Sequence, residues 1–319
     1  MITVSFAAHR PETISLGYAE MLRNDVIILE EPSQHGFTRM LDNAISISEY
    51  FLDSDIEYPE YGRSMARVLQ KLHRKGKKIY QVEPYLDRLY QIHEHFAHGK
   101  TPDDIMRDSK LAPVYRAEKK ATACLIQYYQ KSVKGPFDEL VDSLINFARA
   151  DAHRIALRDQ LRAMRIAEMW SAELSKSEIY VESGYIHFGL FKSIRRLLAS
   201  QVRIQPFYVL EQVVRPLLGK KQVLGPGDLL TLLFMFKKNI SVDIARLLAV
   251  RSLIYIKLLT KDEIIPENEN DFPHTYDEIR ALKMVNNLDM EDCHELFRRI
   301  HFQNPGKCVQ MVKAYLMSG

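Results

Sequence analysis

The sequence lacks several features that would assign a protein to a familiar class. It has three cysteines in 319 residues, Cys124, Cys293 and Cys308, and no two of them form a CxxC pair. This argues against a cysteine-built zinc site and favours a reducing cytoplasm. The longest apolar stretch lies around Leu229–Phe236 and is too short to cross a membrane. Because no basic and apolar leader precedes the first strand-like segment, we expect a cytoplasmic protein without a signal peptide.

An excess of one charge is also absent. Lys and Arg number 44 and Asp and Glu number 41, which gives a net charge of +3 with no long block of one sign. Nucleic-acid binding is neither demanded nor excluded by this balance, and we do not expect it. The sequence contains no GxSxG elbow, Walker A motif, GxGxxG after the first strand or HExxH. These absences disfavour a serine hydrolase, a nucleotide-driven motor and a dinucleotide oxidoreductase.

Four short apolar segments are typical of buried strands, and each runs into a residue that can do chemistry. These residues are His9, the pair Glu30-Glu31, Glu83 and His187. The carboxyl ends of parallel strands gather along one edge of a sheet, so we expect these side chains to meet there. Two imidazoles and two or three carboxylates at one place could bind a divalent metal or perform acid/base chemistry.

The order of the predicted elements indicates an α/β fold with a mainly parallel sheet. A strand, a helix that starts near Pro11 and a second strand form a βαβ unit, which implies parallel strands. We expect an α/β core over residues 1–200 that holds a helical insertion at about 85–175. From Pro206 onward the pattern predicts only helices, and so a helical C-terminal domain over 201–319. Several of these helices are apolar on more than one face, which predicts packing on the core or a homo-oligomer interface.

An arginine-rich helix is predicted before the last strand. Arg154, Arg158, Arg162 and Arg165 are spaced i, i+4, i+8 and i+11, which places them in one stripe. The stripe could bind a phosphate or carboxylate, neutralise the carboxylates at the sheet edge or follow a nucleic-acid backbone. It could equally be a solvated face whose arginines pair with neighbouring acidic residues.

Three further positions bear on the site. Glu12, three residues after His9, could cap the predicted helix or join His9 at the site. Consecutive strand residues face opposite ways, so only one of Glu30 and Glu31 should point into the cleft. Gly184 would allow the backbone to approach a ligand closely.

This layout resembles the superfamily that contains TraB/PrgY proteins, TIKI proteases, ChaN-like proteins and erythromycin-esterase-like proteins. The segment Gly-Tyr-Ile-His at 184–187 matches the second Gly-x-x-His motif of that superfamily. The first motif is altered, because Phe6 stands where a glycine would precede Ala-Ala-His9. Glu30 or Glu31 resembles the acidic residue after the second strand, and Arg158-Asp159 resembles the Arg-Asp/Asn pair. The resemblance covers about residues 1–200.

The resemblance implies a hydrolase of peptide or ester bonds that acts on a peptide or a small molecule, because some relatives are metal-dependent proteases or hydrolyse esters. Other relatives bind haem, so the resemblance locates a site better than it defines a reaction. A non-catalytic binding or regulatory protein is an alternative, and phosphate or nucleic-acid binding through the arginine stripe is another. We expect His9, His187 and Glu12 to hold a divalent metal or a positioned water. We expect Glu30, Glu31, Glu83 and Arg158 to take part in catalysis. Arg154 and Gly184 are the residues that we expect to bind substrate.

Overall fold

The chain folds into two compact units. The computed structural model describes residues 1–52, 58–267 and 269–318. Unit 1 comprises Met1–Tyr115, Ile155–Pro216 and Glu263–Asp271, and unit 2 comprises Arg116–Arg154, Leu217–Asp262 and Phe272–Gly319. This division differs from the predicted boundary at residue 200, because the chain stays in unit 1 as far as Pro216. It also divides the predicted helical insertion between the two units.

Unit 1 contains a parallel sheet. Its strands within the described residues are β1 (Ile2–Phe6), β2 (Val26–Leu29), β3 (Lys78–Gln81), β4 (Ile179–Val181) and β5 (Ile204–Tyr208). They lie in the order β3-β2-β4-β1-β5, and every neighbouring pair is parallel. The predicted α/β class is therefore confirmed. Strands β1 and β2 are buried along their whole length, which explains why they read as nearly continuous apolar runs.

Strand β5 corrects the prediction that only helices follow Pro206. It pairs with β1 from Ile204 opposite Ile2 to Tyr208 opposite Phe6. Pro206 lies in the middle of the strand and cannot donate a ladder hydrogen bond, which sheets tolerate at an edge, and β5 is an edge strand. The first helix after Pro206 begins only at Glu211.

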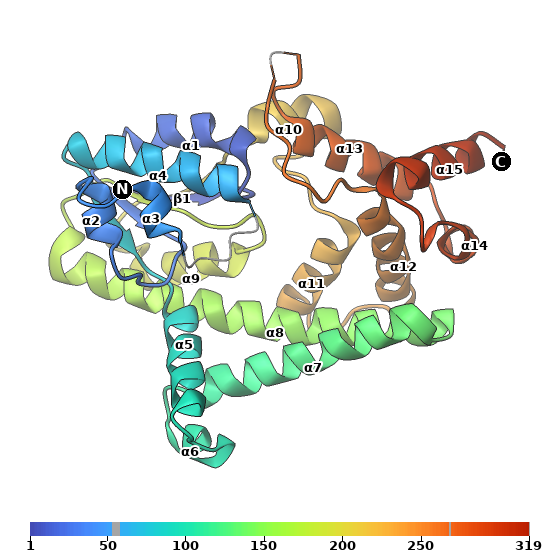
Figure 1. The fold of residues 1–319 in the computed structure, drawn as a ribbon, viewed down its shortest axis with the longest axis horizontal. Coiled ribbons are helices and arrows are strands. Elements are labelled where there is room, and N and C mark those ends of the chain that lie inside the picture. The colour runs from blue at the N-terminus through green and yellow to red at the C-terminus, as the bar shows by residue number, and fades with distance from the viewer. Residues whose placement is uncertain (53–57, 268, 319) are drawn as a thin grey trace. The chain divides into compact units, whose positions relative to one another are not determined.

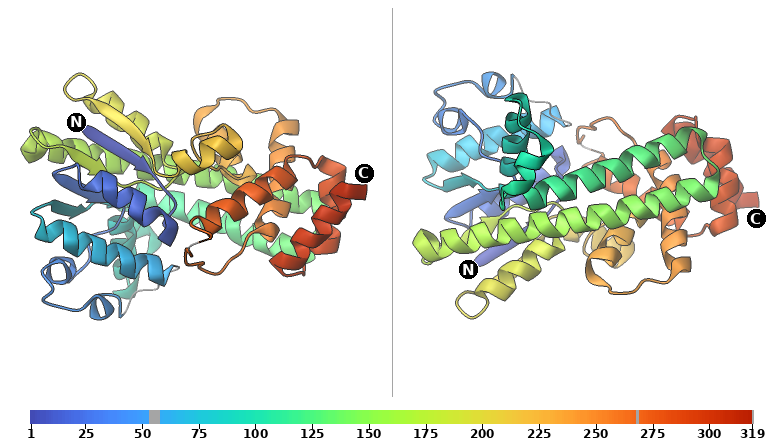
Figure 2. Two further views of the ribbon diagram at one scale, coloured as in Figure 1. Left: turned by 90° about the horizontal axis from the view of Figure 1, so that it is seen from above. Right: turned by 90° about the horizontal axis from the view of Figure 1, so that it is seen from below.

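Helices cover both faces of this sheet (Figures 1 and 2). The helices of unit 1, with α10 extending two residues beyond it, are η1 (Pro11–Thr13), α1 (Ile14–Met21), α2 (Phe37–Leu41), α3 (Ile47–Tyr50), α4 (Pro59–Arg74), α5 (Pro84–Ala97), α6 (Pro102–Arg107), η2 (Trp170–Leu174), α9 (Phe188–Leu198) and α10 (Glu211–Leu218). Val26 and Ile28 pack toward the end of α8 and toward α9, whereas Ile27 and Leu29 pack toward α1, α2 and α4. This alternation follows from the two-residue period of a strand.

Two long helices pass from one unit to the other. They are α7 (Ala112–Lys134) and α8 (Phe137–Met169). The last part of α8, from Ile155, belongs to unit 1 and packs on the sheet through Ala163, Ile166 and Met169. Helix α8 therefore brings its side chains next to the strands that carry the predicted site.

Unit 2 is helical in its described residues. In addition to parts of α7 and α8 it contains α11 (Pro226–Phe236), α12 (Val242–Leu258), α13 (Pro273–Val285), α14 (Met290–Ile300) and α15 (Pro305–Ser318). Helix α12 contacts the other four, and its Val250, Leu253 and Ile254 are fully or almost fully buried. Nowhere in the described parts of the chain is a helix both long and apolar enough to span a membrane.

Candidate functional site

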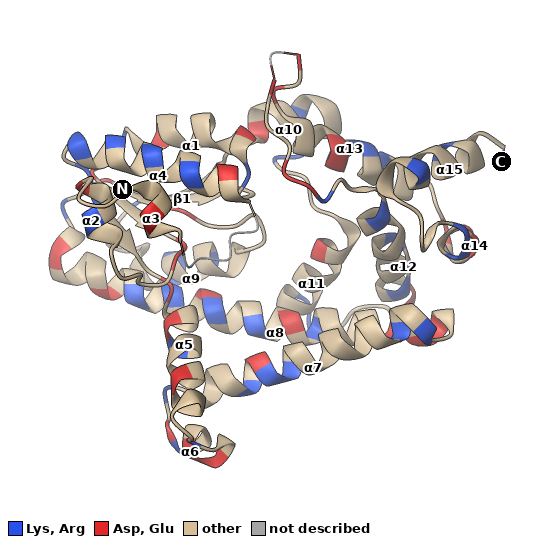
Figure 3. Ribbon diagram, in the orientation of Figure 1, with Lys and Arg blue, Asp and Glu red and all other residues tan. Residues whose placement is uncertain are grey.

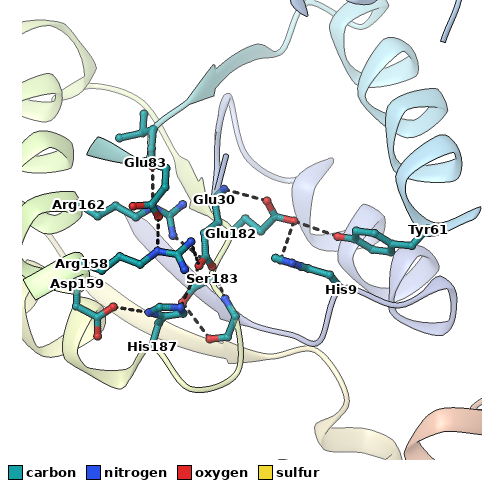
Figure 4. Close-up of polar contacts among 12 residues, drawn as sticks. His9, Glu30, Tyr61, Glu83, Arg158, Asp159, Arg162, Glu182, Ser183 and His187 are labelled. Atoms are coloured by element: carbon teal, nitrogen blue, oxygen red, sulfur yellow. Dashed lines mark hydrogen bonds and ion pairs between the residues drawn. The ribbon is translucent and has the colours of Figure 1, made fainter. Parts of the chain in front are cut away.

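The loops that follow four strands bring their polar side chains together at one edge of the sheet (Figure 4). These side chains are His9 after β1, Glu30 and Glu31 after β2, Glu83 after β3, and Glu182 and Ser183 after β4. The pairing continues beyond β1, because Ala7 bridges in parallel to Gly184. The carboxyl ends of the strands thus converge as parallel topology requires.

Glu30 lies at the centre of a buried group of charges. Its Oε1 is 2.9 Å from Nη2 of Arg158 and 3.0 Å from Nε2 of His187. Its Oε2 accepts a hydrogen bond from the backbone N–H of Gly184 at 2.5 Å and lies 3.6 Å from Nη1 of Arg162. Burial alone would raise the pKa of Glu30, but His187, Arg158 and Arg162 hold it well below its usual value. Glu30 is therefore an ionised carboxylate inside the protein.

His187 is held between two carboxylates. Its Nε2 contacts Glu30 at 3.0 Å and its Nδ1 contacts Oδ1 of Asp159 at 2.5 Å, and the residue is 6% exposed. Burial would lower the pKa of His187, but Glu30 and Asp159 raise it to about 10. The ring is then an imidazolium whose two N–H groups both donate to carboxylates, so it has no lone pair for a metal.

The Gly-x-x-His motif explains how His187 reaches this position. Strand β4 ends at Val181, earlier than the predicted strand, and the chain then turns. The backbone N–H of His187 donates to the carbonyl of Gly184 at 3.1 Å, and α9 begins at the next residue. A β-carbon on Gly184 would lie 3.2 Å from Cδ2 of His187, which is tighter than ordinary packing. Glycine at this position lets the turn close against the ring.

Helix α8 supplies the cations. Arg158 joins two strand ends, because its guanidinium pairs with Glu30 at 2.9 Å and with Glu83 at 3.0 Å. One turn later Arg162, which is 2% exposed, donates from Nε to the carbonyl of Val82 at 2.9 Å. Asp159 comes from the same helix. We call this set the buried network, and its members are Glu30, Glu83, Arg158, Asp159, Arg162 and His187.

The arginine stripe is paired within the chain. Besides Arg158 and Arg162, Arg154 pairs with Asp151 at 2.6 Å, and Arg165 pairs with Glu168 at 3.4 Å. Figure 3 shows basic and acidic residues interspersed along α8. These pairs give no support to a phosphate or nucleic-acid site on the stripe, since the guanidiniums already have carboxylate partners.

A second cluster, formed by His9, Tyr61 and Glu182, borders the buried network. We call it the His9 cluster. Glu182 is 6% exposed, and its Oε2 accepts a hydrogen bond from the backbone N–H of Glu30 at 3.0 Å. Its Oε1 accepts one from the hydroxyl of Tyr61 at 3.2 Å and lies 3.8 Å from Nε2 of His9. The rings of His9 and Tyr61 stack at 5.5 Å (Figure 4).

The hydroxyl of Tyr61 is a permanent donor in this cluster. Burial and the neighbouring Glu182 raise the pKa of Tyr61 well above its usual value. Its helix, α4, is capped at the N-terminus by Glu263, which accepts hydrogen bonds from the backbone N–H groups of Glu60 and Tyr61 at 2.9 and 2.7 Å. A residue some 200 positions along the chain thus helps to place Tyr61 beside Glu182.

The His9 cluster opens into a cavity of about 300 Å³. We call it the aromatic cavity. Glu31 lies in its wall, where Nε2 of Gln81 donates to Oε2 of Glu31 at 2.8 Å. Burial and the nearby Glu182 raise the pKa of Glu31, whereas the pKa of Glu30 is lowered. Most of the other described lining residues are aromatic or apolar, and the described lining residues are His9, Glu31, Gln34, Phe37, Met40, Tyr50, Phe51, Tyr58, Tyr61, Gly62, Met65, Ala66 and Leu69.

Most of the predicted site residues join either the buried network or the wall of the cavity, and two, Glu12 and Arg154, join neither. Glu30, Glu83, Arg158 and His187 join the buried network, with Gly184 packed against it, while His9 and Glu31 line the cavity. Glu12 is buried in η1 and is not among the described residues that line the cavity. Arg154 belongs to unit 2, as do its partners Glu118 and Asp151.

The donor set does not fit the predicted metal. His187 uses both ring nitrogens on carboxylates, and His9 faces Glu182 whereas His187 faces Glu30. Within the ranges that the structure describes, no three His, Cys, Asp or Glu side chains are grouped so that they could hold a metal ion. Glu12 contributes to no such group.

Three residues of these clusters were not singled out from the sequence. Glu182 directly follows the last residue of β4, as Glu30 directly follows the last residue of β2, so the same strand-end rule could have found it. Arg162 was counted in the stripe, but nothing in a helical pattern distinguishes a buried arginine from its exposed neighbours. Tyr61 carries no local signal, because its position depends on the packing of α4.

The chain is similar in sequence to an archaeal protein over nearly its whole length. The chain is 31% identical over 296 residues to an uncharacterized protein of Archaeoglobus fulgidus, and the match covers 93% of this chain and 97% of that protein. No family model matches the chain, and no solved structure matches it. Because the identity extends over nearly the whole of both proteins, the chain belongs to the same family as this archaeal protein.

Proposed function

We propose that the protein is a hydrolase of ester or peptide bonds in which His9 activates water at the aromatic cavity. The observation that carries this proposal is the pairing of an imidazole in the cavity wall with a buried carboxylate. The side chain of His9 is 40% exposed, whereas that of Glu182, 3.8 Å away, is 7% exposed. An accessible histidine backed by a buried carboxylate is a common arrangement for a general base.

The reaction follows from these positions. His9 accepts a proton from a water molecule as the water oxygen adds to the carbonyl carbon of the substrate. Glu182 stabilises the imidazolium that forms, and the hydroxyl of Tyr61 holds Glu182 in place through its hydrogen bond. The imidazolium then gives its proton to the leaving oxygen or nitrogen as the scissile bond breaks.

The buried network has a positioning role in this proposal. Glu30 connects the two clusters, because its backbone N–H donates to Glu182 while its carboxylate binds Gly184, Arg158 and His187. The network thereby fixes the loop that carries Glu182. Residues held this tightly supply a rigid support for the groups that touch substrate.

Hydrolysis assays with matched histidine variants test the proposal. Purified protein is assayed on 4-nitrophenyl acetate, 4-nitrophenyl butyrate and short chromogenic peptides. Removal of a general base lowers the rate by about 10²–10⁴-fold, so His9→Asn should lose that much of kcat/KM. His153→Asn, an exposed histidine of unit 2, is the control and should retain the rate. Equal rates for His9→Asn and the wild type would contradict the proposal.

A chelator separates this mechanism from the metal-dependent one implied by the resemblance. Hydrolysis should persist after dialysis against EDTA, because His9, Glu182 and Tyr61 need no ion. Loss of activity in EDTA with recovery on addition of Zn²⁺ or Mn²⁺ would instead favour the metal-dependent form.

A non-catalytic binding protein is the second candidate. Phe6 occupies the place of the motif glycine, and its ring stacks on Phe188 at 5.0 Å and on Tyr208 at 5.1 Å. An apolar core residue at this position distinguishes the chain from proteins that carry the intact motif. This candidate predicts ligand binding in the cavity without turnover of any ester or peptide.

A further inference from the structure

The wall of the aromatic cavity contains three rings linked by contacts. Tyr50 contacts Phe51 at a ring-centroid distance of 4.9 Å and Phe37 at 6.2 Å. Tyr58 and Tyr61 also line the cavity. Such a wall favours an apolar ligand body, and the faces of its rings carry the negative end of a quadrupole that attracts cations.

Among the described residues that line this cavity, Glu31 is the one carboxylate, and no described lysine or arginine pairs with it. No Lys or Arg appears among the described residues that line the cavity. Its Oε2 is held by Gln81, whose amide also donates to the hydroxyl of Tyr50 at 3.2 Å. The other oxygen of Glu31 makes no hydrogen bond within the described part of the chain and is available to a ligand.

The surroundings of Glu31 favour a cation as the ligand. Burial and the negative charge of Glu182 both raise the pKa of Glu31, and the hydrogen bond from Gln81 and the neighbouring His9 offset them only in part. Within the described part of the chain, the hydroxyls of Tyr50 and Tyr61 also lie close enough to Glu31 for its charge to raise their pKa values. A positive charge placed beside Glu31 would offset the repulsion between the two carboxylates. A ligand anion would meet no lysine or arginine among the described lining residues and would face the carboxylates of Glu31 and Glu182.

We propose that the aromatic cavity binds the ammonium group of an amine at Glu31, with the apolar body of the amine against Phe37, Tyr50 and Phe51. Resting on the proposed function, this inference names the substrate class as esters or amides that carry a free amine. The ammonium group would donate hydrogen bonds to Glu31 and lie near the aromatic faces.

Three probes of similar shape and different charge test the inference. They are 2-phenylethylammonium, 2-phenylethanol and 3-phenylpropionate, and their binding to the full-length protein is measured by ligand-observed NMR titration at about pH 8, where most imidazoles are neutral. We expect the ammonium probe to bind about tenfold more tightly than the alcohol, as a charge-assisted hydrogen bond provides. We expect the propionate to bind more weakly than the alcohol.

Two variants assign the preference to Glu31. Glu31→Gln keeps the shape of the side chain and should reduce the preference for the ammonium probe to within about twofold. Glu49→Gln removes an exposed carboxylate one residue from Tyr50 and should leave the preference unchanged. Equal binding of the three probes by the wild type, no binding of any of them, or a preference that survives Glu31→Gln would overturn the inference.

These outcomes are distinguishable from failure of the proposed function. Binding of the probes requires no turnover. A preference for the ammonium probe without any ester or peptide hydrolysis would therefore support amine binding at Glu31 and contradict the proposed hydrolase activity. Hydrolysis that depends on His9, together with equal affinity for the three probes, would support the proposed hydrolase activity and contradict amine binding at Glu31.

Discussion

Two adjacent glutamates provide a strong test of the buried network, because the same substitution should be strongly destabilising at Glu30 and nearly neutral at Glu31. Glu30→Gln removes the negative charge that faces Arg158 and His187 at 2.9 and 3.0 Å. It also places an NH₂ group against neighbours that are themselves donors, among them the N–H of Gly184. Glu31→Gln instead removes a carboxylate whose pKa is raised by burial and by Glu182.

The magnitude follows from burial. Breaking a buried ion pair by removing one partner costs about 3–5 kcal/mol, because the other charges stay buried without compensation. Glu30 has three such charged partners and is buried, so we expect Glu30→Gln to lose that much stability. For Glu31→Gln, relief of repulsion offsets the altered hydrogen bond to Gln81, and we expect a change within about 1 kcal/mol.

The single tryptophan makes the assay specific to unit 1. Trp170 lies in η2 and packs in the sheet core with Ile166 and Leu174. Urea unfolding followed by its fluorescence therefore reports on the unit that holds both glutamates, even where two units unfold separately. Equal losses for the two variants, or a neutral Glu30→Gln, would refute the view that Glu30 is the centre of a buried ion cluster.

Two further predictions concern the same network. Because the folded pKa of His187 is about 10, above the usual value for histidine, its charge contributes stability in full below about pH 6.5 and loses that contribution as pH rises through 10. The stability advantage of the wild type over His187→Gln, measured by thermal unfolding, should therefore shrink between these values, and a constant difference would speak against the assignment. Gly189→Ala should cost about 1–3 kcal/mol, because its β-carbon would overlap Oδ2 of Asp159. Gly17→Ala, in α1 of unit 1, meets only ordinary contacts and should change stability by less than about 1 kcal/mol in the same urea titration.

The strand ends could be read from the sequence because the signal is local. Each apolar run that reads as a strand does form one, and the residue types that follow it are visible in the chain itself. Parallel topology then brings distant strand ends together, which is why Glu30, Glu83 and His187 could be placed at one edge of the sheet. The helical nature of α8 was equally visible, but it was the resemblance of Arg158-Asp159 to a family motif that placed Arg158 at the site, where it pairs with Glu30.

The burial and the contacts of each side chain could not be predicted from the sequence. His9 and His187 look alike in sequence, yet one lies in a cavity wall and the other is enclosed by two carboxylates, because burial depends on the packing of α8 and α9. Strand β5 was missed because Pro206 is unfavourable in a strand unless that strand is at the edge of its sheet, and edge position is a property of the whole fold. Tyr61 depends on α4 and on its cap by Glu263, which no local pattern links.

The central claim is that His9 and Glu182 act as one catalytic unit, and a double-mutant cycle tests it most directly. Rates of ester hydrolysis are measured for the wild type, His9→Asn, Glu182→Gln and the double variant. Residues that act together show strongly non-additive losses. The double variant should be no slower than His9→Asn alone. Losses that multiply, so that the double variant is slower by the product of the two single effects, would contradict the account.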